Sequence, residues 1–177
     1  MTKAACIGEC MIELSDLGEG RLLRAYGGDT LNTAVYLARL GVAVDYVTAL
    51  GDDAWSDEMI AGWQAEGVGT GPVLRLPGRL PGLYVIQTGA RGERRFFYWR
   101  DSAAARSLFA VSQTPQLAAA LAGYDLVYLS GVTLSLYGEA GRARLMDALD
   151  GVRERGGRIA FDTNFRPRGW PDRATAE

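Results

Sequence analysis

The sequence predicts an α/β fold, in which a mostly parallel sheet is flanked by helices and a small antiparallel β unit leaves the core. Short apolar segments alternate with amphipathic helical segments near both ends of the chain, a pattern typical of parallel sheets with crossover helices. Between them, two β-prone segments flank the Gly-rich turn at 89–92, which indicates a hairpin. Glycine and polar residues follow several apolar segments, as at the carboxyl ends of parallel strands.

The first part of the chain alternates short strands with two helices. The expected elements are strands at 4–8, 11–14, 21–26 and 45–50, with 21–26 pairing with 11–14, and helices that begin near Asp29 and span 54–66. In the second of these helices, residues at helical spacing mark a predicted buried face; they are Trp55, Met59, Ile60 and Trp63.

The turn Gly27-Gly28 and the helix after it are the centre of the predicted arrangement. Two glycines let the backbone turn tightly and let another molecule approach. Asp29 is expected to be the N-cap, because its carboxylate can accept from free N–H groups of the first turn. Gly41 is expected to end this helix. An ordinary capped helix after an ordinary loop would leave the same pattern.

The second part begins with the predicted hairpin and then returns to alternation. The expected elements are strands at 83–88 and 94–99, a helix at 115–121, a strand at 125–129, a helix at 138–155 and a strand at 158–161. Polar clusters follow several of the core strands, at 8–9, 51–52, 130–131 and 162–164. Ligands bind at the carboxyl edge of open parallel sheets, so one site is expected there, although strand ends carry polar loop residues in any case.

Composition excludes several classes of function. The 177 residues are 48% hydrophobic with a net charge of −2, which argues for a globular chain and against nucleic-acid or membrane-surface partners. No apolar run approaches a membrane span, and the N-terminus does not read as a signal peptide, so a cytoplasmic location is expected. The sequence has no histidine, which removes histidine bases and ligands. Cys6 and Cys10 suggest neither a disulfide framework nor a metal site, and no metal ligands are assigned.

The remaining chemistry is that of recognition. Asn32 lies where a polar side chain could meet hydroxyl groups, and Tyr84 and Tyr98 combine a flat face with a hydroxyl, as sugar sites often do. Arg100 and Arg166 could hold an anion. These tyrosines and arginines also have structural interpretations. Tyrosines more often pack in a core than contact a ligand. Arg100 could tie the hairpin to a carboxylate such as Asp101, and Arg166 could pair with Asp162.

The chain resembles the ribokinase-like carbohydrate kinases. The segments that carry this resemblance are residues 7–14 and 27–33. Within that family the chain is similar to the 2-keto-3-deoxygluconate kinases, through 80–84, 98–100, 128–131 and 162–168. Each segment alone is weakly specific, but together they follow the family's order along nearly the whole chain.

The resemblance implies ATP-dependent phosphorylation of the 6-hydroxyl of 2-keto-3-deoxygluconate, a sugar acid, with Mg²⁺ as the accompanying ion. The residues that match its substrate positions are Gly28, Asp29, Thr30, Leu31, Asn32, Tyr84, Tyr98, Arg100 and Arg166. Those that match positions near the nucleotide are Asn164, Phe165 and Arg166. The resemblance also implies a β lid over the substrate, with strands from about 11–26 and 82–99, and subunits that pair through this lid.

One departure from the family concerns the catalytic base. Members carry it as the aspartate of a Gly-Ala-Gly-Asp motif in their second half, and this sequence has no such motif. Residues 1–177 are therefore expected to form an incomplete ribokinase-like domain that lacks the C-terminal half and is inactive alone. Two other functions remain open, a sister sugar kinase such as a fructokinase and a non-catalytic module that binds sugar acids.

Overall fold

A four-stranded parallel sheet forms the core of the molecule. The computed structural model describes residues 2–176. The strand order is β10-β9-β1-β4, and every neighbouring pair is parallel. The strands are β1 (Lys3–Ile7), β4 (Ala43–Val47), β9 (Leu126–Ser130) and β10 (Arg158–Asp162). The predicted mostly parallel sheet is therefore confirmed.

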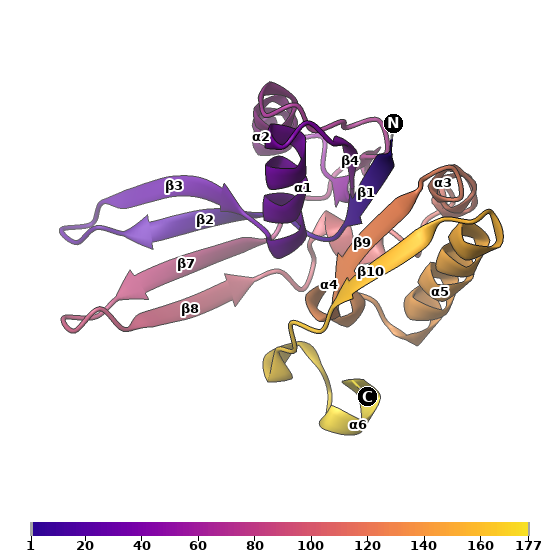
Figure 1. The fold of residues 1–177 in the computed structure, drawn as a ribbon. Coiled ribbons are helices and arrows are strands. Elements are labelled where there is room, and N and C mark those ends of the chain that lie inside the picture. The colour runs from indigo at the N-terminus through magenta and orange to yellow at the C-terminus, as the bar shows by residue number, and fades with distance from the viewer. Residues whose placement is uncertain (1, 177) are drawn as a thin grey trace.

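Helices cover both faces of this sheet (Figure 1). One face carries α1 (Asp29–Arg39) and α2 (Ala54–Ala65), and the other carries α3 (Thr114–Leu121) and α5 (Glu139–Glu154). Strand β1 contributes side chains to both faces, because successive side chains of a strand point to opposite sides of the sheet. Ala4 and Cys6 pack in the cluster with α1 and α2, whereas Ala5 and Ile7 pack with α3 and α5. The sheet is thus the middle of three layers.

The segment expected as one strand at 45–50 divides into two. After β4 the chain forms β5 (Ala49–Leu50), which pairs with β6 (Leu74–Arg75) outside the core sheet. Sequence periodicity did not predict the shorter elements, which have too few residues to establish a pattern. They are the 3₁₀ turns η1 (Ala104–Ser107) and η2 (Pro167–Gly169) and the helix α4 (Gly131–Ser135). The sequence from Trp170 onward predicts the beginning of a helix, and α6 (Arg173–Ala176) lies there.

A second sheet, here called the outer sheet, projects from the core (Figure 1). It has the order β3-β2-β7-β8, with strands β2 (Met11–Asp16), β3 (Leu22–Gly27), β7 (Leu83–Thr88) and β8 (Arg94–Trp99). Both hairpins are antiparallel as predicted, but the central pair β2–β7 is parallel. Turn residues predict a hairpin locally, whereas the pairing of two distant hairpins depends on tertiary contacts.

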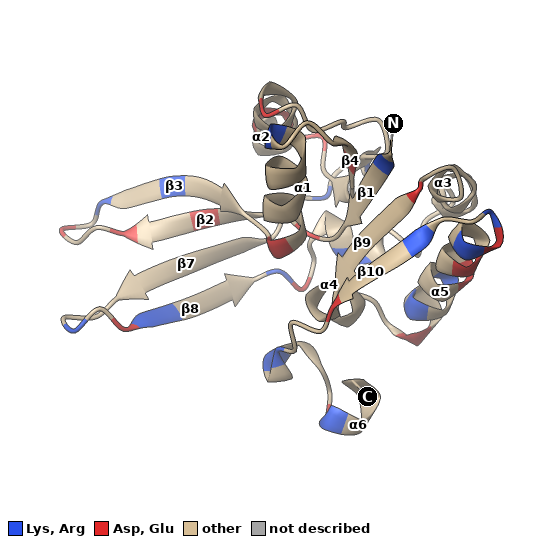
Figure 2. Ribbon diagram, in the orientation of Figure 1, with Lys and Arg blue, Asp and Glu red and all other residues tan. Residues whose placement is uncertain are grey.

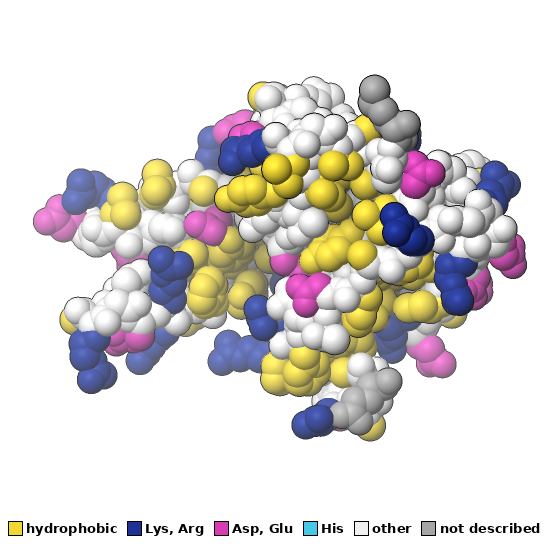
Figure 3. All heavy atoms as spheres, in the orientation of Figure 1, with side chains coloured by type: hydrophobic (Ala, Val, Ile, Leu, Met, Phe, Trp, Pro, Cys, Tyr) yellow, Lys and Arg dark blue, Asp and Glu magenta, His cyan; other side chains and the backbone are white. Residues whose placement is uncertain are grey.

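The outer sheet contacts the start of α2. Trp55, expected in the buried face of α2, is 41% exposed. The guanidinium of Arg24, from β3, lies 4.3 Å from the centroid of the Trp55 ring and pairs with Glu58 at 2.7 Å. Trp55 therefore packs against a cation from the outer sheet rather than in the core. Figure 3 shows hydrophobic side chains gathered where the outer sheet meets the core.

Charges of both signs are interspersed over the core and the outer sheet (Figure 2). The electrostatics of any site at the junction therefore depend on individual nearby groups rather than on a broad surface of one sign. Among the residues described, no helix combines the length and the apolar character needed to cross a membrane.

Candidate functional site

Asp29 is not the N-cap of α1, contrary to the sequence prediction. The N-cap is Gly28, and no side chain caps this helix end. Instead, Asp29 Oδ2 accepts hydrogen bonds from Ser130 Oγ at 2.6 Å and Asn164 Nδ2 at 2.8 Å. These donors stand at the ends of β9 and just beyond β10. The carboxylate therefore links the start of α1 to the carboxyl edge of the core sheet.

The next three residues, in the first turn of α1, differ in the exposure of their side chains. The Thr30 side chain is buried, with its hydroxyl 3.2 Å from the hydroxyl of Tyr46. Leu31 is buried in the core beside α1. Asn32 is exposed. Side-chain contact with a substrate is therefore open to Asn32, whereas Thr30 and Leu31 offer mainly their backbone.

Aromatic side chains gather on one face of the outer sheet. Tyr84 lies directly opposite Tyr98 in the β7–β8 register, with ring centroids 5.8 Å apart, and Phe96 stacks on Tyr98 at 6.3 Å. Tyr84 is buried and donates its hydroxyl hydrogen to Glu13 Oε2, from the neighbouring strand β2. Burial, together with this carboxylate, raises the pKa of Tyr84. Tyr98 is 47% exposed, so its ring is available to a ligand.

Arg100 follows β8 and forms an ion pair with Glu9, which follows β1. The Glu9 side chain is only 2% exposed, whereas that of Arg100 is 20% exposed. Of the two roles predicted for Arg100, a carboxylate partner within the chain is thus present, but it is Glu9 rather than Asp101. The sequence predicts Glu9 only as part of the polar cluster at 8–9.

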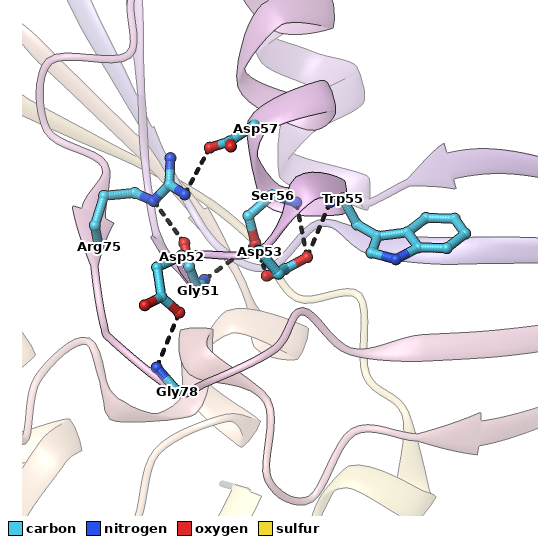
Figure 4. A network of polar contacts seen from close by, with 8 residues as sticks. All are labelled: Gly51, Asp52, Asp53, Trp55, Ser56, Asp57, Arg75 and Gly78. Atoms are coloured by element: carbon cyan, nitrogen blue, oxygen red, sulfur yellow. Dashed lines mark hydrogen bonds and ion pairs between the residues drawn. The ribbon is translucent and has the colours of Figure 1, made fainter.

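The polar groups of the loop after β5 are hydrogen-bonded to other groups of the protein, as Figure 4 shows. Asp53 Oδ1 accepts from the backbone N–H groups of Trp55 and Ser56 at 3.0 and 3.1 Å. Asp52 Oδ1 accepts from the N–H of Gly78 at 2.9 Å, and Arg75 binds the carbonyl oxygen of Gly51. Asp53 therefore caps α2, while the polar cluster predicted at 51–52 holds the loop that leads to β7.

The segment after β10 contains the residues matched to the nucleotide. Asn164 has a left-handed φ of 29° and donates its backbone N–H to Asp162 Oδ1 at 3.0 Å. Arg166 is exposed, and no ion pair joins it to Asp162, although the structure describes both residues. Phe165 is 42% exposed. It lines a hollow of about 310 Å³ with Gly131, Leu134, Phe161, Thr163, Trp170, Arg173 and Ala176.

The predicted residues thus form two groups. Tyr84 and Tyr98 meet on the outer sheet, with Arg100 paired to Glu9 at its β8 end, whereas Asp29 and Asn164 meet at the carboxyl edge of the core. Glu9, Glu13 and Ser130 belong to these groups but were not predicted as site residues. Residues 2–176 contain no cluster of three acidic or cysteine side chains that could hold a metal ion.

The pfkB family carbohydrate kinase model matches residues 1–177. A 2-dehydro-3-deoxygluconokinase from Dickeya dadantii is 51% identical over 170 residues, covering 94% of this chain and 54% of that protein. A fructokinase from Salmonella typhimurium is 33% identical over 174 residues, covering 97% of this chain and 54% of that protein.

Among solved structures, a fructokinase with bound ATP from Xylella fastidiosa superposes with a TM-score of 0.81. It is 26% identical, and the match covers 96% of this chain and 51% of that one. The chain spans about half the length of the relatives it matches. Since the family model covers the whole sequence and the fold is shared, this chain belongs to the pfkB family of carbohydrate kinases.

Proposed function

We propose that this chain is the sugar-acid recognition part of an ATP-dependent kinase that phosphorylates the 6-hydroxyl of 2-keto-3-deoxygluconate, also called 2-dehydro-3-deoxygluconate. The observation that carries the proposal is the 51% identity to the Dickeya dadantii 2-dehydro-3-deoxygluconokinase, against 33% to the Salmonella typhimurium fructokinase, over similar shares of the chain. The geometry of the outer sheet supports it.

Three side chains at the outer sheet suit a sugar acid. The ring of Tyr98 offers a flat, partly exposed face beside Tyr84. Arg100 follows two residues after Tyr98 and supplies positive charge for a carboxylate. In the proposed complex the sugar lies between this face and the turn before α1, where Asn32 is exposed to bind hydroxyl groups.

The proposed nucleotide contacts lie after β10. Arg166 is exposed, with its Nη1 bonded only weakly to the carbonyl oxygen of Phe165 at 3.4 Å, so its guanidinium suits a phosphate. Asn164 is held in place by Asp29. When bound, ATP supplies the phosphoryl group and Mg²⁺ offsets its charge. We assign the catalytic base to no residue of this chain.

Calorimetric titration of the chain with three ligands tests the proposal. The ligands are 2-keto-3-deoxygluconate, its neutral amide and fructose. We expect the sugar acid to bind about tenfold or more tightly than the amide, because a charge-assisted hydrogen bond contributes about 1.5–3 kcal/mol. Tighter binding of fructose would instead favour the fructokinase alternative.

A further inference from the structure

Glu9 connects the two sheets of the molecule. It lies between β1 of the core and β2 of the outer sheet, and its carboxylate forms an ion pair with Arg100 at the end of β8. The carboxylate is almost wholly buried, and neither of its oxygens makes a hydrogen bond of good geometry within residues 2–176. Glu9 therefore depends on the charge of Arg100 for its stabilisation.

Two glycines accommodate Glu9. A Cβ atom at Gly28 would overlap the carbonyl oxygen of Glu9, and a Cβ atom at Gly82 would lie 2.8 Å from its Oε1. Gly28 precedes α1 and Gly82 precedes β7. The close approach that a glycine permits is thus made by Glu9 itself at both positions. Backbone and side chain of this one residue fill the space between the turn, the core and the outer sheet.

Burial and nearby charges act in different directions on the pKa of Glu9. Burial raises the pKa of the Glu9 carboxyl, while Arg100 and, at longer range, Arg106 lower it, and Asp29 raises it further. Arginine stays protonated in proteins, so a half-buried guanidinium without its carboxylate would leave an uncompensated charge. Each member of the pair therefore holds the other at the junction.

We propose that Glu9 is a positioning residue, whose ion pair with Arg100 fixes the β8 end of the outer sheet against the core and aims the guanidinium at the substrate carboxylate. The first half of this proposal stands on the ion pair, whereas the second half rests on the proposed function. Arg100 keeps 20% of its side chain exposed, so it can face Glu9 and a ligand together.

Hydrogen–deuterium exchange of the chain without ligand tests the first half. Glu9→Gln keeps the shape of the side chain and removes its charge. We expect amide exchange in β7 and β8 to rise by about tenfold or more, with exchange in β1 and β9 unchanged. The matched control is Glu58→Gln, which removes the exposed ion pair with Arg24 that also joins the outer sheet to the core. Because exposed pairs contribute little, this variant should leave β8 near the wild type.

Two results would overturn the first half. One is unchanged exchange in β8 of Glu9→Gln, and the other is an equal rise in Glu58→Gln. If Glu9→Gln unfolds, the double variant Glu9→Gln/Arg100→Gln replaces it, because neither partner is then left as an unpaired charge. Exchange in β8 of a folded double variant must still rise, and an unchanged value would count against the proposal.

Affinity for the sugar acid tests the second half. Glu9→Gln should weaken binding of 2-keto-3-deoxygluconate by about ten- to a hundredfold, with little change for the neutral amide. In an Arg100→Gln background, Glu9→Gln should have no further effect, because it acts through Arg100. Normal affinity of Glu9→Gln would reject the second half. If the wild-type chain does not bind the sugar acid, the proposed function is contradicted, and the second half of the proposal fails with it. The exchange measurement would still decide the first half.

Discussion

Asn164 Nδ2 lies 2.8 Å from Asp29 Oδ2 and donates a hydrogen bond to it, across 135 residues of sequence. Ser130 Oγ donates to the same oxygen at 2.6 Å. One carboxylate thus joins the turn matched to the sugar with the segment matched to the nucleotide. It also holds the amide of Asn164, whose backbone is in the left-handed region at φ 29°.

Asp29→Ala is expected to destabilise the chain through this junction. Removal of the carboxylate leaves the Ser130 and Asn164 donors unpaired, which should lower the free energy of unfolding by about 1–3 kcal/mol. Urea denaturation measures the change. The control is Asp16→Ala, which removes a carboxylate bonded to the N–H of Gly18 in an exposed turn. Equal losses in the two variants would contradict a special role for Asp29.

Gly28→Ala tests the close approach of Glu9 to the turn. Gly28 has an extended φ of −171° that any residue can adopt, so the expected cost comes from overlap of the new Cβ with the Glu9 carbonyl oxygen. We expect a loss of about 1–3 kcal/mol in the free energy of unfolding.

The matched control for this variant is Gly62→Ala, inside α2, where a new Cβ would meet nothing within 4 Å. Alanine is the better helix former, so this change should stabilise the chain by about 0.5–1 kcal/mol. Thermal melts of both variants should shift in opposite directions. A Gly28→Ala melt at or above the wild-type temperature would rule out the overlap.

Asp53 is expected to give the stability a dependence on pH. Burial raises the pKa of this carboxyl, but hydrogen bonds from Ser56 and Trp55 outweigh it, and the pKa in the folded chain lies below the usual 3.8. The ionised form is therefore favoured by folding, so its contribution is present above 3.8 and lost as the pH falls through the folded pKa.

Asp53→Ala should cost about 1 kcal/mol near neutral pH, as the loss of a helix N-cap does. The difference from the wild type should shrink as the pH falls below the folded pKa, because the wild-type cap is then protonated. Urea denaturation across the acidic range measures this difference. A difference that stays constant down to the lowest pH would show that the charge of Asp53 is not what stabilises the cap.

The parts of the fold that depend on local sequence could be predicted. Apolar periodicity located the core strands and the long helices, and glycine signals located both hairpins. Gly41 ends α1 with a φ of +82°, as expected of a helix stop. The failures came from distant contacts. Asp29 looked like a cap because its nearest donors in sequence are backbone N–H groups, whereas Ser130, 101 residues away, reaches it in the fold.

The candidate site was predictable to the same extent. Tyr84 and Tyr98 belong to one hairpin, so a correct register brings them together, and Arg100 follows directly after β8. Glu9 was missed as a partner because its role depends on a loop 91 positions later, which no local pattern reveals. The turn Gly27-Gly28 predicted the close approach of a ligand, but the space that a Cβ would fill at Gly28 is taken by the backbone of Glu9.

Phosphorylation by a chimeric enzyme is the sharpest test of the proposed sugar-acid kinase function. Residues 1–177 would be joined to the remaining half of the Dickeya dadantii relative, with the whole relative as the positive control and the chain alone as the negative control. We expect the chimera to transfer phosphate from ATP to the 6-hydroxyl of 2-keto-3-deoxygluconate, with a kcat/KM above that for fructose, and the chain alone to transfer none. A folded chimera that prefers fructose, or that binds ATP but leaves the sugar acid unphosphorylated, would contradict the proposed function.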